Sequence, residues 1–102
     1  MDGSTPRVEI YSSPLCPYCW RARLLLRRKG VACQKIPIRY FMGVRLPTRR
    51  FREMVARTGG DVTIPQIFVG GRYLGTDDDL SALDREGRLD DILAGRCPVP
   101  AA

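Results

Sequence analysis

Two cysteines separated by two residues carry the clearest sign of chemistry in this sequence. Residues 16–19 read CPYC and follow a short β-branched run at 8–11 and a polar turn that contains Pro14. This order predicts a strand, a turn and then two cysteines on the first turn of a helix. Cysteines three residues apart on a helix lie on one face, close enough for their sulfurs to bond. A CxxC pair beside a β-α-β pattern indicates thiol–disulfide exchange.

The two cysteines are expected to have different roles. Cys16 falls at or just before the first helical residue, where unpaired backbone N–H groups and the positive end of the helix dipole favour a thiolate. Cys19 lies one turn deeper and should be less exposed. We therefore predict that Cys16 is the attacking thiol and that Cys19 resolves the mixed disulfide. Pro17 suits the first turn, where a missing N–H removes no hydrogen bond.

A CxxC pair is also half of many zinc sites, which need two further Cys or His ligands at suitable spacing. The chain has four cysteines and no histidine, and Cys33 and Cys97 stand alone in the sequence. No metal is therefore expected. Cys33 falls in the apolar alternation of a predicted strand and is interpreted as a small buried side chain rather than a reactive thiol.

Length and charge exclude several classes of protein. With 102 residues and a net charge of +6, the chain is predicted to be a single domain, with a core at about 7–94 and a tail at 95–102. A basic chain first suggests nucleic acid, but the arginines form no stripe interleaved with aromatic residues. A basic surface that attracts anionic partners is favoured instead. No apolar run is long enough for a membrane span or a secretory signal, so we expect a cytoplasmic monomer.

The predicted elements alternate in type. Strands are expected at about 7–11, 31–38, 63–69 and 72–74, and helices at about 17–29, 48–57, from 76 onward, and 89–93. The order β-α-β-α-β-β-α-α predicts an α/β fold with a four-stranded mixed sheet and helices on both faces. The first two strands should be parallel through a right-handed crossover, and the last two should form an antiparallel hairpin. Lys35 and Pro37 suit an edge strand.

The first predicted helix carries an apolar stripe and a tryptophan next to the cysteine pair. Tyr18, Ala22, Leu25 and Leu26 recur at helical spacing and are expected to face the sheet. Trp20 either stays partly exposed beside the cysteines or packs against a neighbouring loop, which is the more common fate of a tryptophan.

Residues 39–47 have no clear period and carry Tyr40, Phe41 and Met42 beside a glycine. These side chains either fold back on the core or form an exposed apolar patch for a partner. Because connectors commonly pack their own side chains, folding back is favoured.

Three signals in the chain together resemble the glutaredoxin family. They are CPYC at 16–19, TIPQIF at 63–68 and GTDDDL at 75–80, and the similarity covers nearly all of residues 8–93. The resemblance implies a thioredoxin-like fold in which Pro65 is a cis-proline that faces the cysteines. A cis bond there turns the preceding backbone outward, so that Ile64 can offer its N–H and C=O to an extended peptide.

In that family the peptide is glutathione, so the resemblance implies a glutathione site. The residues expected to bind it are Tyr18, Thr63, Ile64, Pro65, Asp78 and Asp79. Backbone N–H groups at the acidic helix start suit the α-carboxylate of glutathione, and the Asp79 side chain suits its α-amino group. Asp77 can be explained by helix capping alone.

The sequence departs from the family pattern where the glycyl carboxylate of glutathione is held. Many members have a lysine at the position of Ser13, and a polar or basic residue near that of Phe51. Arg50, Arg52 or Arg21 is expected to substitute.

The activity that the resemblance implies is a glutathione-dependent thiol–disulfide oxidoreductase. Its substrates would be protein disulfides and glutathione mixed disulfides, with no nucleic-acid or membrane partner. One alternative is an iron–sulfur carrier in which two protomers share a cluster through Cys16 and bound glutathione, although Pro17 disfavours it. Another is a redoxin reduced by a thioredoxin-reductase-type flavoenzyme. This alternative stays open because Ser13 stands where many family members have a lysine.

Overall fold

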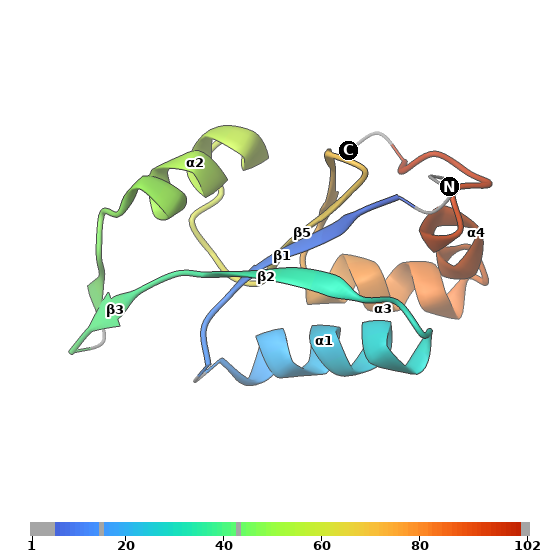
Figure 1. Cartoon of the computed structure of the whole chain (residues 1–102), viewed down its shortest axis with the longest axis horizontal. Helices are drawn as coiled ribbons and strands as arrows, with labels where there is room; N and C mark the ends of the chain where they lie inside the picture. The colour runs from blue at the N-terminus through green and yellow to red at the C-terminus, as the bar shows by residue number, and fades with distance from the viewer. Residues whose placement is uncertain (1–5, 15, 43, 101–102) are drawn as a thin grey trace.

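A four-stranded mixed sheet in the order β2-β1-β5-β6 forms the centre of the fold (Figure 1). The computed structural model describes residues 6–14, 16–42 and 44–100. The strands of this sheet are β1 (Val8–Ser12), β2 (Cys33–Pro37), β5 (Gln66–Val69) and β6 (Arg72–Gly75). β1 pairs with β2 in parallel and with β5 antiparallel, and β5 pairs antiparallel with β6. The predicted pairing is confirmed, including the edge position of β2.

Helices cover both faces of the sheet, as predicted. They are α1 (Pro17–Arg28), α2 (Arg49–Thr58), α3 (Asp77–Arg85) and the short α4 (Leu89–Leu93). In the view of Figure 1, α1 and α3 lie below the sheet and α2 lies above it. Within the described ranges, no helix has the length and apolar character needed to cross a membrane.

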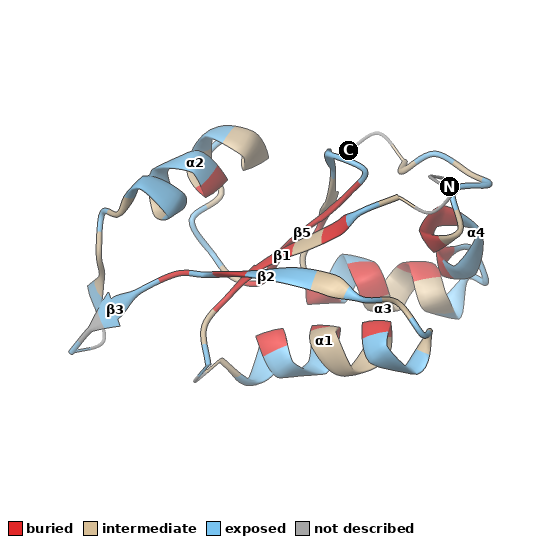
Figure 2. Ribbon diagram, viewed as in Figure 1, coloured by how far each residue is buried: buried red, intermediate tan, exposed pale blue. Residues whose placement is uncertain are grey.

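Each face of the sheet has its own apolar core, and Figure 2 shows the buried residues on the sides of the helices that face the strands. The larger core, on the side of α1, α3 and α4, includes Ile10, Leu26 and Ile67. The smaller core, under α2, includes Tyr11 and Phe68. Ile10 and Tyr11 are neighbours in the chain but face opposite sides, because successive side chains alternate across a strand.

The inward face of α1 differs from the predicted one. Cys19, Ala22 and Leu26 are buried, whereas Tyr18 is 56% exposed, so the expectation that Tyr18 faces the sheet was wrong. Tyr18 precedes Cys19 by one residue and therefore lies about 100° around the helix from it. Cys19 takes the inward position on the first turn. The helix has Lys29 as its C-cap, at the predicted end near residue 29.

A separate hairpin follows β2, in which β3 (Tyr40–Phe41) pairs antiparallel with β4 (Val44–Arg45). The expectation that this segment folds back on the core was wrong for the side chains described, since Met42 is 87% and Val44 65% exposed. The two short strands satisfy their backbone groups with each other, and Figure 1 shows β3 lying away from the four-stranded sheet. The side chain of Phe41 lies outside the described part of the chain.

Part of the predicted C-terminal tail packs on the fold. Cys97 and Val99 pack against the larger core, and Arg96 pairs with Asp91 of α4 at 2.8 Å. These contacts hold the tail beside α4.

Candidate active site

Cys16 is the N-cap residue of α1, as predicted from the position of Pro17. Its backbone is extended, with φ −92° and ψ 112°, and its Sγ accepts a hydrogen bond from the Cys19 backbone N–H at 3.3 Å. The side chain of Cys16 is partly exposed, and both cysteines are free thiols. A sulfur in this position receives an N–H donor that the helix would otherwise leave unpaired.

Cys19 occupies a different environment only one helical turn away. It is completely buried, with 0% of its surface exposed. Burial, together with the hydrogen bond to Cys16, raises the pKa of Cys19 to about 12. Cys19 is therefore a protonated thiol at neutral pH, shielded from any disulfide that arrives from solvent. The structure thus gives the pair the predicted asymmetry, with Cys16 partly exposed to solvent and Cys19 buried.

The sheet register places the three sequence signals at one end of the sheet. Tyr11, near the end of β1, pairs with Gln66, the first residue of β5. Gly75, the last residue of β6, pairs with Ile67. The turn into α1, the segment 61–65 before β5 and the start of α3 therefore meet at this end.

The segment 61–66, here called the Ile64 loop, is held by hydrogen bonds. Thr63 donates to Asp61 Oδ1 from its N–H at 2.9 Å and from its hydroxyl at 2.7 Å. Gln66 Nε2 donates to the Thr63 carbonyl at 2.8 Å and to Thr63 Oγ1 at 3.1 Å. Tyr73 donates its hydroxyl to Gln66 Oε1 at 2.6 Å. The predicted cis peptide bond between Ile64 and Pro65 is confirmed.

This network lowers the pKa of Asp61. The hydroxyl and the N–H of Thr63 hold the pKa of Asp61 below its usual range. An ionised Asp61 therefore fixes Thr63 next to Ile64. Asp61, Gln66 and Tyr73 had no role predicted from the sequence, because polar residues near a turn do not show by their types which of them bond to one another.

The start of α3 has the predicted capping geometry. Asp79 Oδ2 accepts hydrogen bonds from the Thr76 N–H at 2.9 Å and from the Thr76 hydroxyl at 3.4 Å. Asp78 is exposed beside it. Gly75, with φ 132°, is required here because a Cβ at this position would overlap the Asp79 carboxylate. The backbone N–H groups of this acidic helix start are suited to a carboxylate ligand.

Asp77 does more than cap the helix. It is buried, and its Oδ2 has no hydrogen-bond partner among the described residues. Arg21 Nη1 of α1 lies 3.7 Å from this oxygen, so Arg21 neutralises Asp77 and links the starts of α1 and α3. Arg21 had been considered as a ligand for the glycyl carboxylate, and its guanidinium is already paired.

A different arginine, Arg45 of β4, lies next to the Ile64 loop. Arg45 Nη1 donates to the carbonyl of Val62, and its guanidinium carbon lies 5.7 Å from the centre of the Phe51 ring. Of the two arginines beside Phe51, Arg52 donates instead to the carbonyl of Pro47 at 2.7 Å, and Arg50 is exposed. Arg45 was missed because its segment had no predicted structure.

The hairpin borders the site through Arg45, which donates to the Val62 carbonyl. Burial raises the pKa of Tyr40, and the positive charge of Arg45 opposes this shift. Among the described residues, no group of three or more His, Cys, Asp or Glu side chains is placed to hold a metal ion.

Comparison with known proteins gives one consistent result. Residues 8–74 match the family model described as Glutaredoxin. The chain is 45% identical over 86 residues to Glutaredoxin 3 of Escherichia coli K12, which covers 84% of this chain and 95% of that relative. It superposes on the solution structure of glutaredoxin from Brucella melitensis with a TM-score of 0.72 at 42% identity, covering 93% of this chain and 96% of the other.

A more distant structure shares the fold. The crystal structure of a buckwheat glutaredoxin–glutathione complex has a TM-score of 0.72 at 24% identity, and the match covers 94% of this chain and 83% of that one. The mixed sheet with helices on both faces is thus the thioredoxin-like arrangement that these proteins share.

Proposed function

The chain belongs to the glutaredoxin family, and from this premise we propose that it uses glutathione to reduce protein disulfides and glutathione mixed disulfides. The observation that carries the proposal is the contrast between Cys16 and Cys19. Cys16 is accessible and receives the Cys19 N–H at its sulfur, whereas Cys19 is buried and protonated at neutral pH. One thiol is therefore placed to react with incoming disulfides, and the other to react only after a bond has formed beside it.

In the first step, the Cys16 thiolate attacks the glutathionyl sulfur of a mixed disulfide. A sulfur–sulfur bond forms between Cys16 and glutathione as the original bond breaks, and the substrate leaves as a thiolate that takes up a proton. A second glutathione, as thiolate, then attacks the glutathionyl sulfur. This step restores reduced Cys16 and releases oxidised glutathione, so one reduced glutathione is consumed for each mixed disulfide.

For a protein disulfide, Cys19 provides a second route. Cys16 attacks the disulfide, and Cys19 then attacks Cys16 and releases the reduced protein. Because the pKa of Cys19 is about 12, its proton must leave as the new bond forms, and the departing substrate thiolate is the group beside it that can accept that proton. Glutathione then reduces the Cys16–Cys19 bond.

The proposed glutathione site lies at the end of the sheet where the three signals meet. The Ile64 backbone would pair with the extended tripeptide, between Thr63 and Pro65. The start of α3 would bind the γ-glutamyl end, with backbone N–H groups on its carboxylate and Asp78 and Asp79 near its amino group. A protein of the same fold has been crystallised in complex with glutathione, which supports glutathione as the ligand. Tyr18, exposed beside Cys16, would cover the sulfur end.

We assign the glycyl carboxylate to Arg45. Its guanidinium contacts the Val62 carbonyl in the Ile64 loop, whereas Arg21 is paired with Asp77. Many family members have a lysine at the position of Ser13, which carries no charge here. Arg45, on β4, would thus supply the positive charge. A planar guanidinium suits a carboxylate because two N–H groups can bind its two oxygens.

The proposal is tested by comparing Cys16→Ser with Cys19→Ser. Turnover of a glutathione mixed disulfide, measured with NADPH, glutathione and glutathione reductase, should be abolished in Cys16→Ser and retained in Cys19→Ser. Reduction of a protein disulfide through the internal bond should be lost in both variants. Full activity without Cys16 would contradict the proposal. Faster reduction by thioredoxin reductase than by glutathione, on the same preparation, would instead favour a redoxin of the other class.

A further inference from the structure

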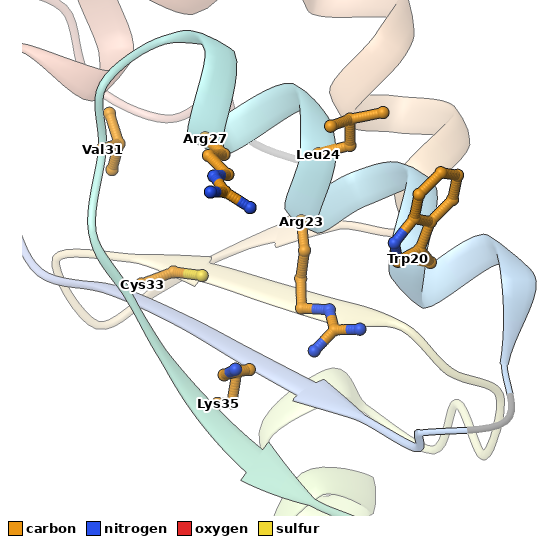
Figure 3. A pocket seen from close by; sticks show the side chains of 7 residues that line it. All are labelled: Trp20, Arg23, Leu24, Arg27, Val31, Cys33 and Lys35. Atoms are coloured by element: carbon orange, nitrogen blue, oxygen red, sulfur yellow. The ribbon is translucent and has the colours of Figure 1, made fainter.

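A cavity of about 360 Å³ lies between the outer side of α1 and the edge strand β2 (Figure 3). Three cationic side chains line it, Arg23 and Arg27 from α1 and Lys35 from β2, and no acidic residue does so among the described residues. Figure 3 shows the arginines extending from α1 toward β2, with the ring of Trp20 near the N-terminal end of α1. We call this cavity the α1–β2 pocket.

One hydrogen-bond donor in the α1–β2 pocket is buried without a partner. The Nε–H of Arg23 is shielded from solvent, and no acceptor lies within hydrogen-bond distance of it among the described residues. Nearly all buried donors in folded proteins have an acceptor, and an unpaired one calls for an explanation. A carboxylate in the pocket would pair with the charge of the Arg23 guanidinium.

The pocket is aligned with the reactive cysteine. Trp20, Arg23 and Arg27 follow Cys16 by four, seven and eleven residues, the spacing that places side chains on one side of a helix. With a rise of about 1.5 Å per residue, Arg23 lies roughly 10 Å along the helix from Cys16. An extended peptide covers this distance with about three residues. A polypeptide whose disulfide lies against Cys16 could therefore reach Arg23.

The remaining lining is mainly apolar. Leu24 and Val31 are partly buried, and they suit the methylene groups of an acidic side chain. Burial raises the pKa of the Cys33 thiol, which favours its uncharged form. The pocket therefore selects by charge and shape.

We propose that the α1–β2 pocket binds an aspartate or glutamate side chain of the substrate polypeptide, about three residues from the cysteine that carries the disulfide. The inference rests on the function proposed above and specifies its substrate class, namely proteins with acidic residues near the reacting cysteine. Glutathione would lie at the Ile64 loop and the start of α3, while the polypeptide extends along α1 toward β2.

Kinetics with matched peptides test the proposal. The substrates are glutathionylated peptides identical except for Glu or Gln three residues before or after the cysteine. For the wild type, kcat/KM should be at least fivefold higher for the Glu peptide in one of the two positions. Arg23→Ala should reduce this preference below twofold, whereas Arg28→Ala removes the same charge from another side of α1 and should retain it. All three proteins should turn over the mixed disulfide of glutathione and 2-mercaptoethanol at equal rates, which shows that the variants are folded.

Equal rates on the Glu and Gln peptides in both positions would overturn the inference, as would an equal loss of preference in Arg23→Ala and Arg28→Ala. If the wild type turned over none of these mixed disulfides, the proposed function itself would fail, and a binding measurement would then decide the role of the pocket.

Binding can be measured without catalysis because Trp20 is the chain's single tryptophan. Peptides with Ser in place of Cys, and without aromatic residues, are titrated while Trp20 fluorescence is recorded. The Glu peptide should produce a saturable change with a Kd at least fivefold lower than that of the Gln peptide, and Arg23→Ala should remove the difference. The same response to both peptides would contradict the pocket assignment, whatever the outcome of the kinetics.

Discussion

The candidate site has two walls that are held in place by different forces. The first turns of α1 carry the cysteines and are fixed by burial, with Cys19 0% exposed and Leu26 0% exposed in the larger core. The Ile64 loop is fixed by hydrogen bonds that run from Asp61 through Thr63 to Gln66 and Tyr73. The α1 wall is therefore part of the packed interior of the fold, whereas the loop wall is held by a local hydrogen-bond network near the surface.

This difference separates the two tasks of the site. Apolar packing is not directional and is shared among many residues, so the position of Cys16 is tied to the stability of the whole domain. Hydrogen bonds are directional, and a few of them set the position of the Ile64 backbone. Damage to the α1 wall should appear first as a loss of stability, and damage to the loop as a loss of glutathione binding. Variants that affect one wall at a time can test this comparison.

The largest effect is expected for Leu26→Ala on the α1 wall. Removing a fully buried leucine should lower the free energy of unfolding by about 2–5 kcal/mol, because transfer and cavity terms add. Chemical denaturation followed by circular dichroism measures this change. At a temperature where the variant is folded, KM for a glutathione mixed disulfide should stay within twofold of the wild type. A large rise in KM with unchanged stability would show that the core does not act as we infer.

Gln66→Leu is the corresponding change in the loop wall. It removes the two hydrogen bonds to Thr63 and the acceptor for Tyr73, so the Ile64 loop loses its main support. We expect KM for the glutathione mixed disulfide to rise about tenfold, which corresponds to roughly 1.4 kcal/mol of lost binding. Steady-state kinetics with glutathione reductase measure this change.

Tyr73→Phe is the matched control for Gln66→Leu. It removes one hydrogen bond from the same network but leaves both bonds between Gln66 and Thr63 in place. Its KM should remain near that of the wild type, and its loss of stability should be about 1 kcal/mol. Equal increases in KM for the two variants would mean that the contacts between Gln66 and Thr63 do not position the loop.

The α1 wall could be predicted from sequence because its signals are local. A cysteine before Pro17 at a predicted helix start is enough to place Cys16 at the N-cap, and the order of apolar segments gives the sheet. The inward face of α1 was harder, since Tyr18 and Cys19 are both compatible with a helical apolar stripe. Only the packing shows that Cys19 takes the buried position.

The loop wall could be predicted only in part. The resemblance identified Ile64 and Pro65, but their support comes from bonds of Asp61 and Gln66 to Thr63, and from Tyr73 on the neighbouring strand, which residue types alone do not specify. The hairpin at 40–45 gave no period because its two strands have only two residues each. Arg45 could not be assigned to the site without that hairpin.

Arg45→Met tests whether this hairpin serves the loop wall. Loss of the guanidinium removes the bond to the Val62 carbonyl and the proposed partner of the glycyl carboxylate. We expect KM for glutathione mixed disulfides to rise about three- to fivefold, with less effect at high salt, because ionic strength screens exposed charges. Arg52→Met, which removes a nearby arginine bonded to Pro47 instead, should leave KM unchanged. An effect in Arg52→Met alone would move the carboxylate site to α2.

The smallest effect concerns the charge of Asp61 in the loop wall. Thr63 lowers the pKa of Asp61 in the folded state, so the stabilisation from its ionised form is present above the unfolded-state value of about 3.9 and is lost as pH falls through the lower folded value. Asp61→Asn keeps an oxygen acceptor but cannot titrate. Between about pH 5 and 3, the midpoint of thermal unfolding should therefore fall less steeply in Asp61→Asn than in the wild type. Glu86→Gln, which removes an exposed carboxylate at the C-cap of α3, should follow the wild-type curve. Parallel curves for the wild type and Asp61→Asn would show that the loop is held without help from this charge, and the contrast between the two walls would then rest on Gln66 alone.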